Sequence, residues 1–257
     1  MKRTLLAMSI SVIALFSACR KESGELVIEL PDEMPIDLAT KITNADGSTV
    51  EKFYYDNDRR LIAKTFRSST RRDSDVVTYD ASGKVVKYDE YYFNRLDEST
   101  AYSYNGNLVT REQTSYSNDG SAYSSTSTFT INSKNQLVEK LRDNGSKYTY
   151  EYDPSGNMIK TFRTETDGVK TELSSFTFDN TNTMMTHCTT PYWWFIVEDY
   201  FPMGSKNNIV SVEGGTKLYE YVYNLHLYPE KVTEISVRDG QKVPGRTHLI
   251  EYKNLNW

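Results

Sequence analysis

The sequence predicts an all-β fold, an up-and-down antiparallel meander of roughly 16 strands built from about eight hairpin repeats. Three observations predict it: a hairpin-sized motif recurs along the chain, apolar and polar residues alternate with a period of two, and no stripe of helical period follows residue 18. Aromatic residues make up 13% of the 257 residues, which favours packed strands and excludes a disordered chain.

Residues 1–18 have the pattern of a secretory signal peptide. Lys2 and Arg3 form a positive start, an apolar run follows at 5–16, and small residues precede Cys19. This run is too short, and too soon followed by charged residues, to favour a membrane span. We therefore predict that residues 1–18 are removed during export.

The stretch 15–19, LFSAC, resembles the lipobox of bacterial lipoproteins. The resemblance implies cleavage before Cys19 and acylation of its thiol, although Phe16 stands where an aliphatic residue is more usual. It predicts lipidation at Cys19 and anchoring at the outer membrane, on either its periplasmic or its surface face. The alternative is an ordinary cleaved signal followed by an incidental cysteine.

The remaining chain is acidic. Cleavage before Cys19 removes two positive charges and no acid, so the net charge falls from −5 to −7. This balance excludes the basic footprint of a nucleic-acid partner. Residues 19–49, with Pro31 and Pro35, are predicted to form a lipid-anchored tether and the strand that leads into the sheet, and residues 50–257 the hairpin repeat domain.

The repeat consists of a strand ending in an aromatic residue and Asp or Asn, a short polar turn, and an aliphatic pair that opens the next strand. Its clearest copy is 150–159, YEYDPSGNMI. Asp or Asn at a strand end can form an Asx-turn, and Gly156 is expected to supply a positive φ. The Asp or Asn positions recur every 21 to 27 residues, at Asp56, Asp80, Asn105, Asn132, Asp153 and Asp179.

A meander this wide is expected to curl into a strongly curved sheet or a flattened barrel whose facing walls pack on each other. Strands that carry Lys and Glu offer no uninterrupted lipid-facing band, so a membrane-spanning barrel is not predicted.

The turns also resemble the YD repeats of Rhs-type proteins, which build β-shells from such hairpins. Together with the signal and the lipobox, the repeat tract over 50–253 is similar to a family of gut-bacterial lipoproteins of unknown function with a porin-like antiparallel β fold. The resemblance implies an architecture and brings no catalytic residue with it.

Motifs for metal or covalent chemistry do not emerge from the sequence. His187, His226 and His248 fall in separate repeats, and on a strand His187 and Cys188 would face opposite sides. A surface histidine beside a buried thiol is the simpler interpretation. We therefore predict a protein that is not an enzyme, with no metal, no cofactor and no catalytic residue.

The uncharged segment 191–197 interrupts the repeat and holds the candidate binding residues Tyr192, Trp193 and Trp194. One interpretation is a core strand or plug that fills the middle of the sheet. The other is an aromatic platform for a sugar ring or for a partner's groove. On a strand the two tryptophans would face opposite sides, so one ring would lie near solvent.

The predicted function is that of a non-enzymatic, lipid-anchored envelope protein whose broad, aromatic-rich β surface binds a polysaccharide. The alternative is a structural or scaffolding component of an envelope assembly that binds a protein partner.

The lipobox generates the first testable prediction. Cys19→Ala should move the protein from the membrane to the soluble fraction, because its thiol is the acceptor of the acyl chains. Metabolic labelling with an alkyne fatty acid measures this directly, with Cys188→Ala as the control that keeps its label. Continued labelling of Cys19→Ala would contradict the lipobox interpretation.

Overall fold

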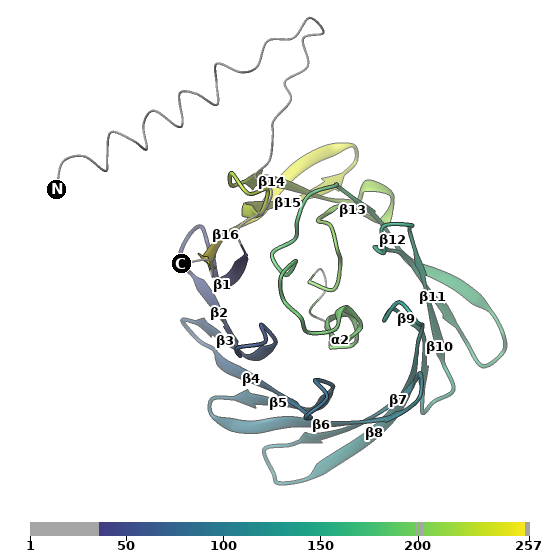
Figure 1. Ribbon diagram of the computed structural model, residues 1–257. Helices are drawn as coiled ribbons and strands as arrows, with labels where there is room; N and C mark the ends of the chain where they lie inside the picture. The colour runs from purple at the N-terminus through teal and green to yellow at the C-terminus, as the bar shows by residue number, and fades with distance from the viewer. Residues whose placement is uncertain (1–35, 199, 201–202, 255–257) are drawn as a thin grey trace, which may run out of the picture. The chain divides into compact units, whose positions relative to one another are not determined.

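The computed structural model describes residues 36–198, 200 and 203–254. These residues form sixteen antiparallel β-strands that close into a barrel (Figure 1). The predicted all-β, up-and-down meander is therefore confirmed, and of the two predicted shapes the barrel is the one observed.

Short turns connect nearly all of the strands, so neighbours in the chain are neighbours in the sheet. The strands are β1 (Asp37–Asn44), β2 (Thr49–Tyr55), β3 (Leu61–Ser68), β4 (Arg72–Tyr79), β5 (Val85–Tyr92), β6 (Arg95–Asn105), β7 (Leu108–Tyr116), β8 (Ala122–Ile131), β9 (Leu137–Arg142), β10 (Lys147–Tyr152), β11 (Met158–Thr164), β12 (Lys170–Phe178), β13 (Ile209–Val212), β14 (Lys217–Tyr223), β15 (Pro229–Arg238) and β16 (Gln241–Asn254).

The first and last strands close the ring by pairing with each other. Asp37 of β1 lies opposite Asn254 of β16, and Asn44 lies opposite His248, so the pairing extends along all of β1. Closure removes the two free sheet edges that an open meander would leave available for pairing with other chains.

Turns with an Asx side chain bonded to the backbone occur at both ends of the barrel. One end, here called the Asx-turn end, is where β1 begins and β16 ends, and it carries the turns at 56–60, 80–84, 132–136, 153–157 and 224–228. The opposite end, here called the distal end, carries the turns at 45–48, 93–94, 143–146 and 239–240.

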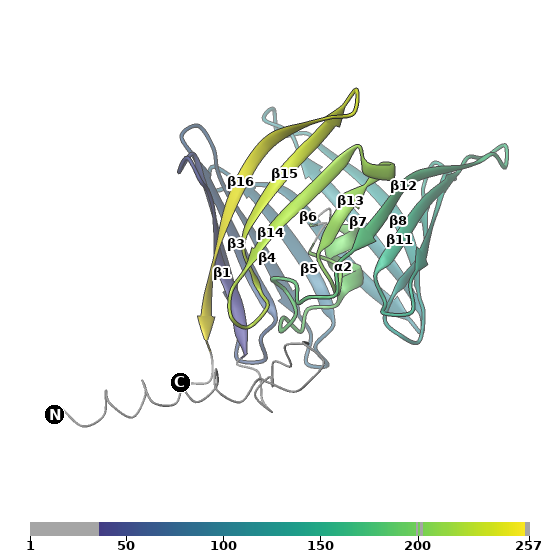
Figure 2. The ribbon, with the colours of Figure 1, turned by 90° about the horizontal axis from the view of Figure 1, so that it is seen from above.

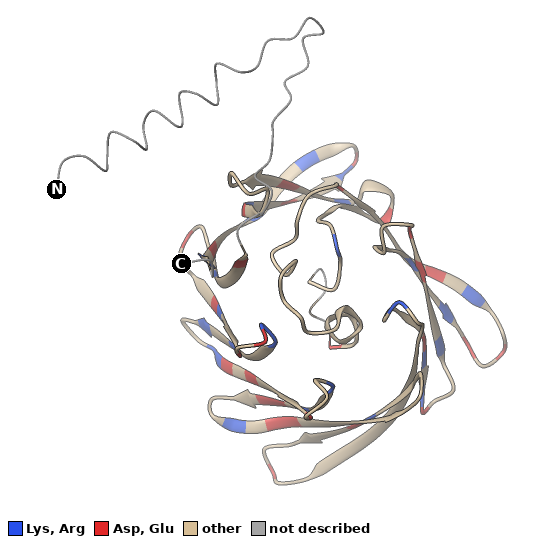
Figure 3. Cartoon of the chain, in the orientation of Figure 1, with Lys and Arg blue, Asp and Glu red and all other residues tan. Residues whose placement is uncertain are grey.

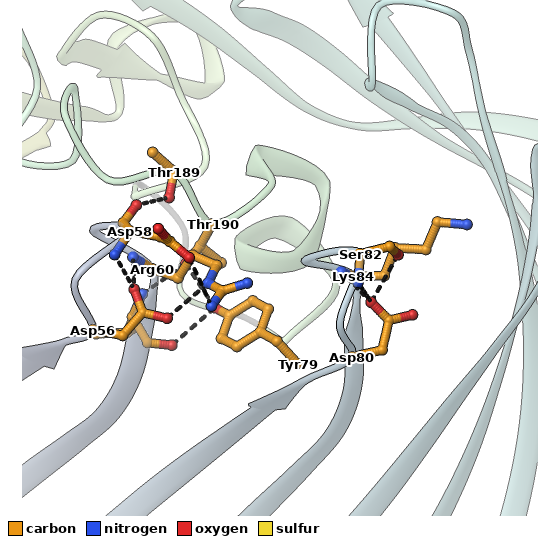
Figure 4. Close-up of polar contacts among 10 residues, drawn as sticks. Asp56, Asp58, Arg60, Tyr79, Asp80, Ser82, Lys84, Thr189 and Thr190 are labelled. Atoms are coloured by element: carbon orange, nitrogen blue, oxygen red, sulfur yellow. Dashed lines mark hydrogen bonds and ion pairs between the residues drawn. The ribbon is translucent and has the colours of Figure 1, made fainter.

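Asp80 shows how the residue that marks each repeat makes its turn (Figure 4). Its Oδ1 accepts hydrogen bonds from the backbone N–H groups of Ser82 and Lys84, at 2.8 and 3.0 Å. The Ser82 hydroxyl and these N–H groups lower the pKa of the Asp80 carboxyl. Side-chain Oδ1 atoms accept backbone N–H groups in the same way at Asp56, Asn132, Asp153 and Asn224.

The described residues between β12 and β13, namely 180–198, 200 and 203–208, lie inside the ring of strands, and we call them the plug (Figures 1 and 2). The plug contains helix α2 (Tyr192–Val197). Of the two alternatives for 191–197, a core strand or a plug, the plug is observed, and the expectation of walls packed directly on each other is wrong. A lone strand in a lumen would leave its backbone groups unpaired, whereas a helical turn pairs them internally, as the bond from Glu198 N–H to Trp194 O at 3.0 Å illustrates.

The hydrophobic core forms where the plug meets the walls. Aromatic and aliphatic side chains of α2 and its flanks, among them Trp193, Trp194 and Phe195, pack against inward-facing residues of β2 to β9. The buried wall residues of this cluster include Phe53, Leu61, Val77, Tyr102, Val109 and Phe129. The aromatic residues of the repeat thus pack on the plug rather than on the opposite wall.

Two threonines of the plug bind the wall at the Asx-turn end (Figure 4). Thr190 Oγ1 accepts the backbone N–H of Leu61 at 2.8 Å and lies 2.8 Å from the Tyr79 hydroxyl. The hydroxyl of Thr189 donates to the carbonyl oxygen of Asp58 at 2.7 Å. These bonds satisfy polar groups at the point where the plug approaches the β2–β3 turn.

Charged residues of both signs are spread over the strands and turns of the barrel (Figure 3). Tyr150 and Tyr152 on β10 face the inside of the barrel, so Glu151 between them faces outward. Lys160 of β11 is paired with Glu151 and therefore faces outward too. Lys160 forms an exposed ion pair with Glu172 at 2.7 Å. No helix in the described part of the chain has the length and apolar character of a membrane span.

Gly156 has a φ of 95°, which confirms the positive φ expected from the repeat. Gly156→Val should lower the free energy of unfolding by about 1–2 kcal/mol, because a β-branched residue is strained in this region. Chemical denaturation measures the loss, with Ser155→Ala in the same turn as the control. An unchanged midpoint for Gly156→Val would contradict the assigned turn.

Candidate functional site in the barrel lumen

A cavity of about 1030 Å³ occupies the lumen between the plug and the distal end. The plug residues Val197, Glu198 and Tyr200 line its floor, and its walls extend to Asp143 and Asn144 in the distal β9–β10 turn. This volume lies near the upper limit of ordinary small-molecule sites. The plug therefore fills part of the lumen, and the cavity extends from the distal end beside the plug as far as Ile209 and Pro229, where β13 and β15 begin.

Acidic side chains outnumber basic ones in the lining of this cavity. Among the described residues that line it, nine are Asp or Glu and five are Lys or Arg. The basic residues are Lys64, Arg71, Arg111, Lys140 and Arg142. An excess of negative charge in a partly enclosed space disfavours anionic ligands.

Glu198, which directly follows α2, makes an ionic link between the plug and the wall. Its two carboxylate oxygens accept hydrogen bonds from the guanidinium of Arg111 on β7, each at 2.8 Å, and one also accepts from the Tyr102 hydroxyl. The side chains of Glu198 and Arg111 are only 2% and 11% exposed. Burial opposes the charge on Arg111, but the hydrogen bonds and charge of Glu198 raise its pKa above the ordinary value.

Glu90 and Glu98 continue this cluster along the cavity wall. They lie opposite each other on β5 and β6, and carboxylate oxygens of Glu90, Glu98 and Glu198 all lie within 4.8 Å of one another. Arg111 reaches Glu98 at 3.4 Å. Burial, and then the charges of Glu98, Asp75 and Glu198, raise the pKa of Glu90 to about 7. Glu98 and Glu198 thus share the guanidinium of Arg111, and Glu90 lies beside them as a third carboxyl group.

A second polar network joins the floor to β3, β4 and β5. The Tyr200 hydroxyl donates to the carboxylate of Asp75 and lies 3.1 Å from the Tyr88 hydroxyl. The Nζ of Lys64 is 3.4 Å from Asp75 and 4.2 Å from the centroid of the Tyr200 ring. Plug and walls are therefore connected by polar contacts on several sides of the cavity floor.

The candidate binding residues Tyr192, Trp193 and Trp194 are brought together in α2, and none of them lines the large cavity. Trp193 and Trp194 are 2% and 0% exposed, so the expectation of one indole near solvent is wrong. The physical reason is that both indoles pack against wall tyrosines, Trp193 against Tyr102 and Trp194 against Tyr88. Tyr192 is half-buried and lines, together with Trp193, a smaller pocket of about 300 Å³ beside Lys206.

His187 and Cys188 lie in the plug rather than on a strand. Cys188 carries a free, buried thiol whose pKa is raised by burial. His187 is half-buried and contacts the hydroxyl of Tyr228, and burial lowers the pKa of its imidazole. Cys19 and the signal segment lie outside the described residues.

The strand number and the closure define a sixteen-stranded, up-and-down antiparallel β-barrel with a plug in its lumen. No family model and no curated protein matches the chain. Among solved structures, a porin-like protein from Bacteroides uniformis aligns with a TM-score of 0.40 and 13% identity, over 87% of this chain and 99% of that one. A porin-like protein from Bacteroides vulgatus gives 0.38 and 13%, over 85% and 100%.

The Tc holotoxin pore of Photorhabdus luminescens aligns with a TM-score of 0.31 and 13% identity, over 88% of this chain and 14% of that one. Likenesses of this degree transfer no function. The fold assignment rests on the strand pairing of the barrel itself.

Sequence reasoning did not identify Glu90, Glu98, Arg111 and Glu198 as a group. A usable signal lay in the period-two pattern of β6, where the inward positions of Tyr104 and Tyr102 continue to Thr100 and Glu98. The inward face of this strand changes from aromatic to acidic toward the distal end. The contribution of Glu198 depends on the path of the plug, which no local pattern indicates.

Trp193→Ala and Trp194→Ala should each lower the free energy of unfolding by about 3–5 kcal/mol, because both remove a fully enclosed indole. Chemical denaturation measures both losses, and Tyr123→Ala, at a side chain that is 68% exposed, is the control with little change. A near-normal midpoint for either tryptophan variant would contradict the packing of α2.

The raised pKa of Glu90 predicts a pH dependence of stability. Between its ordinary value of 4.5 and about 7, the folded protein binds this proton more tightly than the unfolded chain does, so its contribution to stability declines as pH rises. Glu90→Gln should therefore raise the melting temperature relative to the parent more at pH 8 than at pH 5.

Glu172→Gln, at an exposed outer position, is the matched control and should behave alike at the two pH values. An equal effect of Glu90→Gln at pH 5 and pH 8 would contradict the assignment of the raised pKa.

Proposed function

We propose that this chain is a non-enzymatic, lipid-anchored protein of the bacterial outer membrane whose lumen binds a neutral glycan. The observation that carries the proposal is the cavity of about 1030 Å³, lined by tyrosines and by charged groups of both signs. Sugar rings offer hydroxyl groups to polar side chains and C–H faces to aromatic rings. A pocket that presents both kinds of surface therefore suits them.

Binding rather than hydrolysis is supported by the placement of the carboxylates. A retaining glycosidase holds two carboxyl groups about 5–5.5 Å apart on either side of the scissile bond. Glu90 and Glu98 are instead cross-strand neighbours on one wall, and Glu198 is held by Arg111 and Tyr102.

The anchor is proposed from the sequence, since Cys19 lies outside the described residues. The lipobox-like stretch before Cys19 and the similarity of the repeats to a lipoprotein family support it. Charged side chains on the outer face, such as Lys160 and Glu172, also favour a barrel that is held at a membrane rather than embedded in it.

The chain enters the sheet at Asp37, at the Asx-turn end, which the plug occupies. The tether that we propose for the residues before Asp37 therefore joins the barrel at the first residue of β1.

An alternative function is scaffolding, in which the barrel binds a protein of the same envelope assembly. Its support is Leu225 in the β14–β15 turn, whose side chain is 94% exposed, with Leu227 beside it at 38%. Adjoining apolar side chains that are exposed on a turn offer a surface that a protein partner can bury.

Native affinity electrophoresis separates these proposals. The full-length protein, extracted from membranes in mild detergent, should be retarded by at least one neutral polysaccharide among laminarin, mannan, dextran and xylan. It should migrate normally with alginate, whose carboxylates the acidic lumen disfavours. Unchanged migration with every polysaccharide would overturn glycan binding in favour of scaffolding.

The same incubations test the absence of catalysis. Assays for new reducing ends should give the same value for each polysaccharide with and without the protein. A release of reducing ends by the parent that Glu90→Gln abolishes would overturn the non-enzymatic assignment.

A further inference from the structure

The β5–β6 hairpin at the distal end contains an unusual turn. Tyr92 pairs with Arg95, so the turn consists of Phe93 and Asn94, with φ values of 50° and 64°. Positive φ at both central residues is the geometry of a type I′ turn, which normally selects Asn, Asp or Gly. A phenylalanine in this conformation is a true outlier.

The β15–β16 hairpin provides an internal comparison at the same end of the barrel. Arg238 pairs with Gln241, and the turn between them consists of Asp239 and Gly240, with φ values of 51° and 75°. The barrel thus makes the same turn elsewhere with residues that suit it. The hairpin therefore does not require a phenylalanine at this position, and a bulky residue strained in this way points to a function.

Phe93 does not contribute to the hydrophobic core, because 52% of the residue is exposed. Its neighbour Tyr92 is 42% exposed, and the two rings meet edge to face with their centroids 4.7 Å apart. Tyr92 also lines the lumen cavity. An exposed aromatic pair therefore lies at the mouth of the pocket.

We propose that Tyr92 and Phe93 form a stacking platform that receives a neutral glycan chain at the distal mouth of the lumen. This inference rests on the proposed function and specifies where the sugar first binds. The edge-to-face arrangement leaves ring surface free for the C–H face of a pyranose, while the polar cavity wall that begins at Tyr92 binds hydroxyl groups. The acidic excess of the lining selects against anionic chains.

The test uses Phe93→Gly in the full-length protein. Glycine adopts this φ without strain, so the melting temperature should stay the same or rise. The dissociation constant for the laminarin, mannan, dextran or xylan that retards the parent should rise at least tenfold. Tyr92→Ala should show a similar loss of affinity.

Tyr54→Ala is the matched control, because Tyr54 is 46% exposed and lies between the inward-facing Phe53 and Tyr55, on the outer face of β2. Its affinity should equal that of the parent. Retention of full affinity by Phe93→Gly and Tyr92→Ala would overturn the platform and leave glycan binding standing. A parent that binds none of the four polysaccharides would overturn the proposed function and the platform together.

Discussion

A barrel of sixteen strands encloses more space than its own inward-facing side chains can fill, and the rest of this structure depends on how that space is occupied. The plug between β12 and β13 fills part of it, where Trp193, Trp194 and Phe195 pack against the aromatic walls. Without that contact, inward rings such as Phe53 and Phe129 would line a wet channel. The hydrophobic effect therefore stabilises the fold by burying the inward-facing wall residues against the plug and not against the opposite wall.

The polar contacts that hold the plug also form the floor of the cavity. Glu198 and Tyr200 reach the wall through Arg111 and Asp75, and both plug residues line the pocket. Burying the Glu198 carboxylate without a positively charged partner would lower the free energy of unfolding, so the fold requires the guanidinium of Arg111. The hydrophobic packing around α2 and the charged floor of the cavity thus both result from the position of the plug inside the barrel.

Local chemistry made much of the fold predictable. The turns at Asp56 and Asp153 depend on a side chain and the few residues that follow it, so short motifs reveal them. The cavity cluster joins Arg111 to Glu198 across 87 residues, and α2 is helical because it is enclosed. Neither the contact between Arg111 and Glu198 nor the helix has a cause in the neighbouring sequence. The uncharged segment 191–197 therefore indicated a plug but not its helical conformation.

Hydrogen exchange of the backbone amides tests most directly whether the plug is part of the folded core. Peptides within 183–198 should exchange as slowly as those of β3 to β8, because α2 can open only when the surrounding walls do. Rapid exchange of 183–198 while these strands stay protected would show a plug that leaves the lumen on its own. That result would contradict the central claim that the barrel and its plug are one cooperative structure.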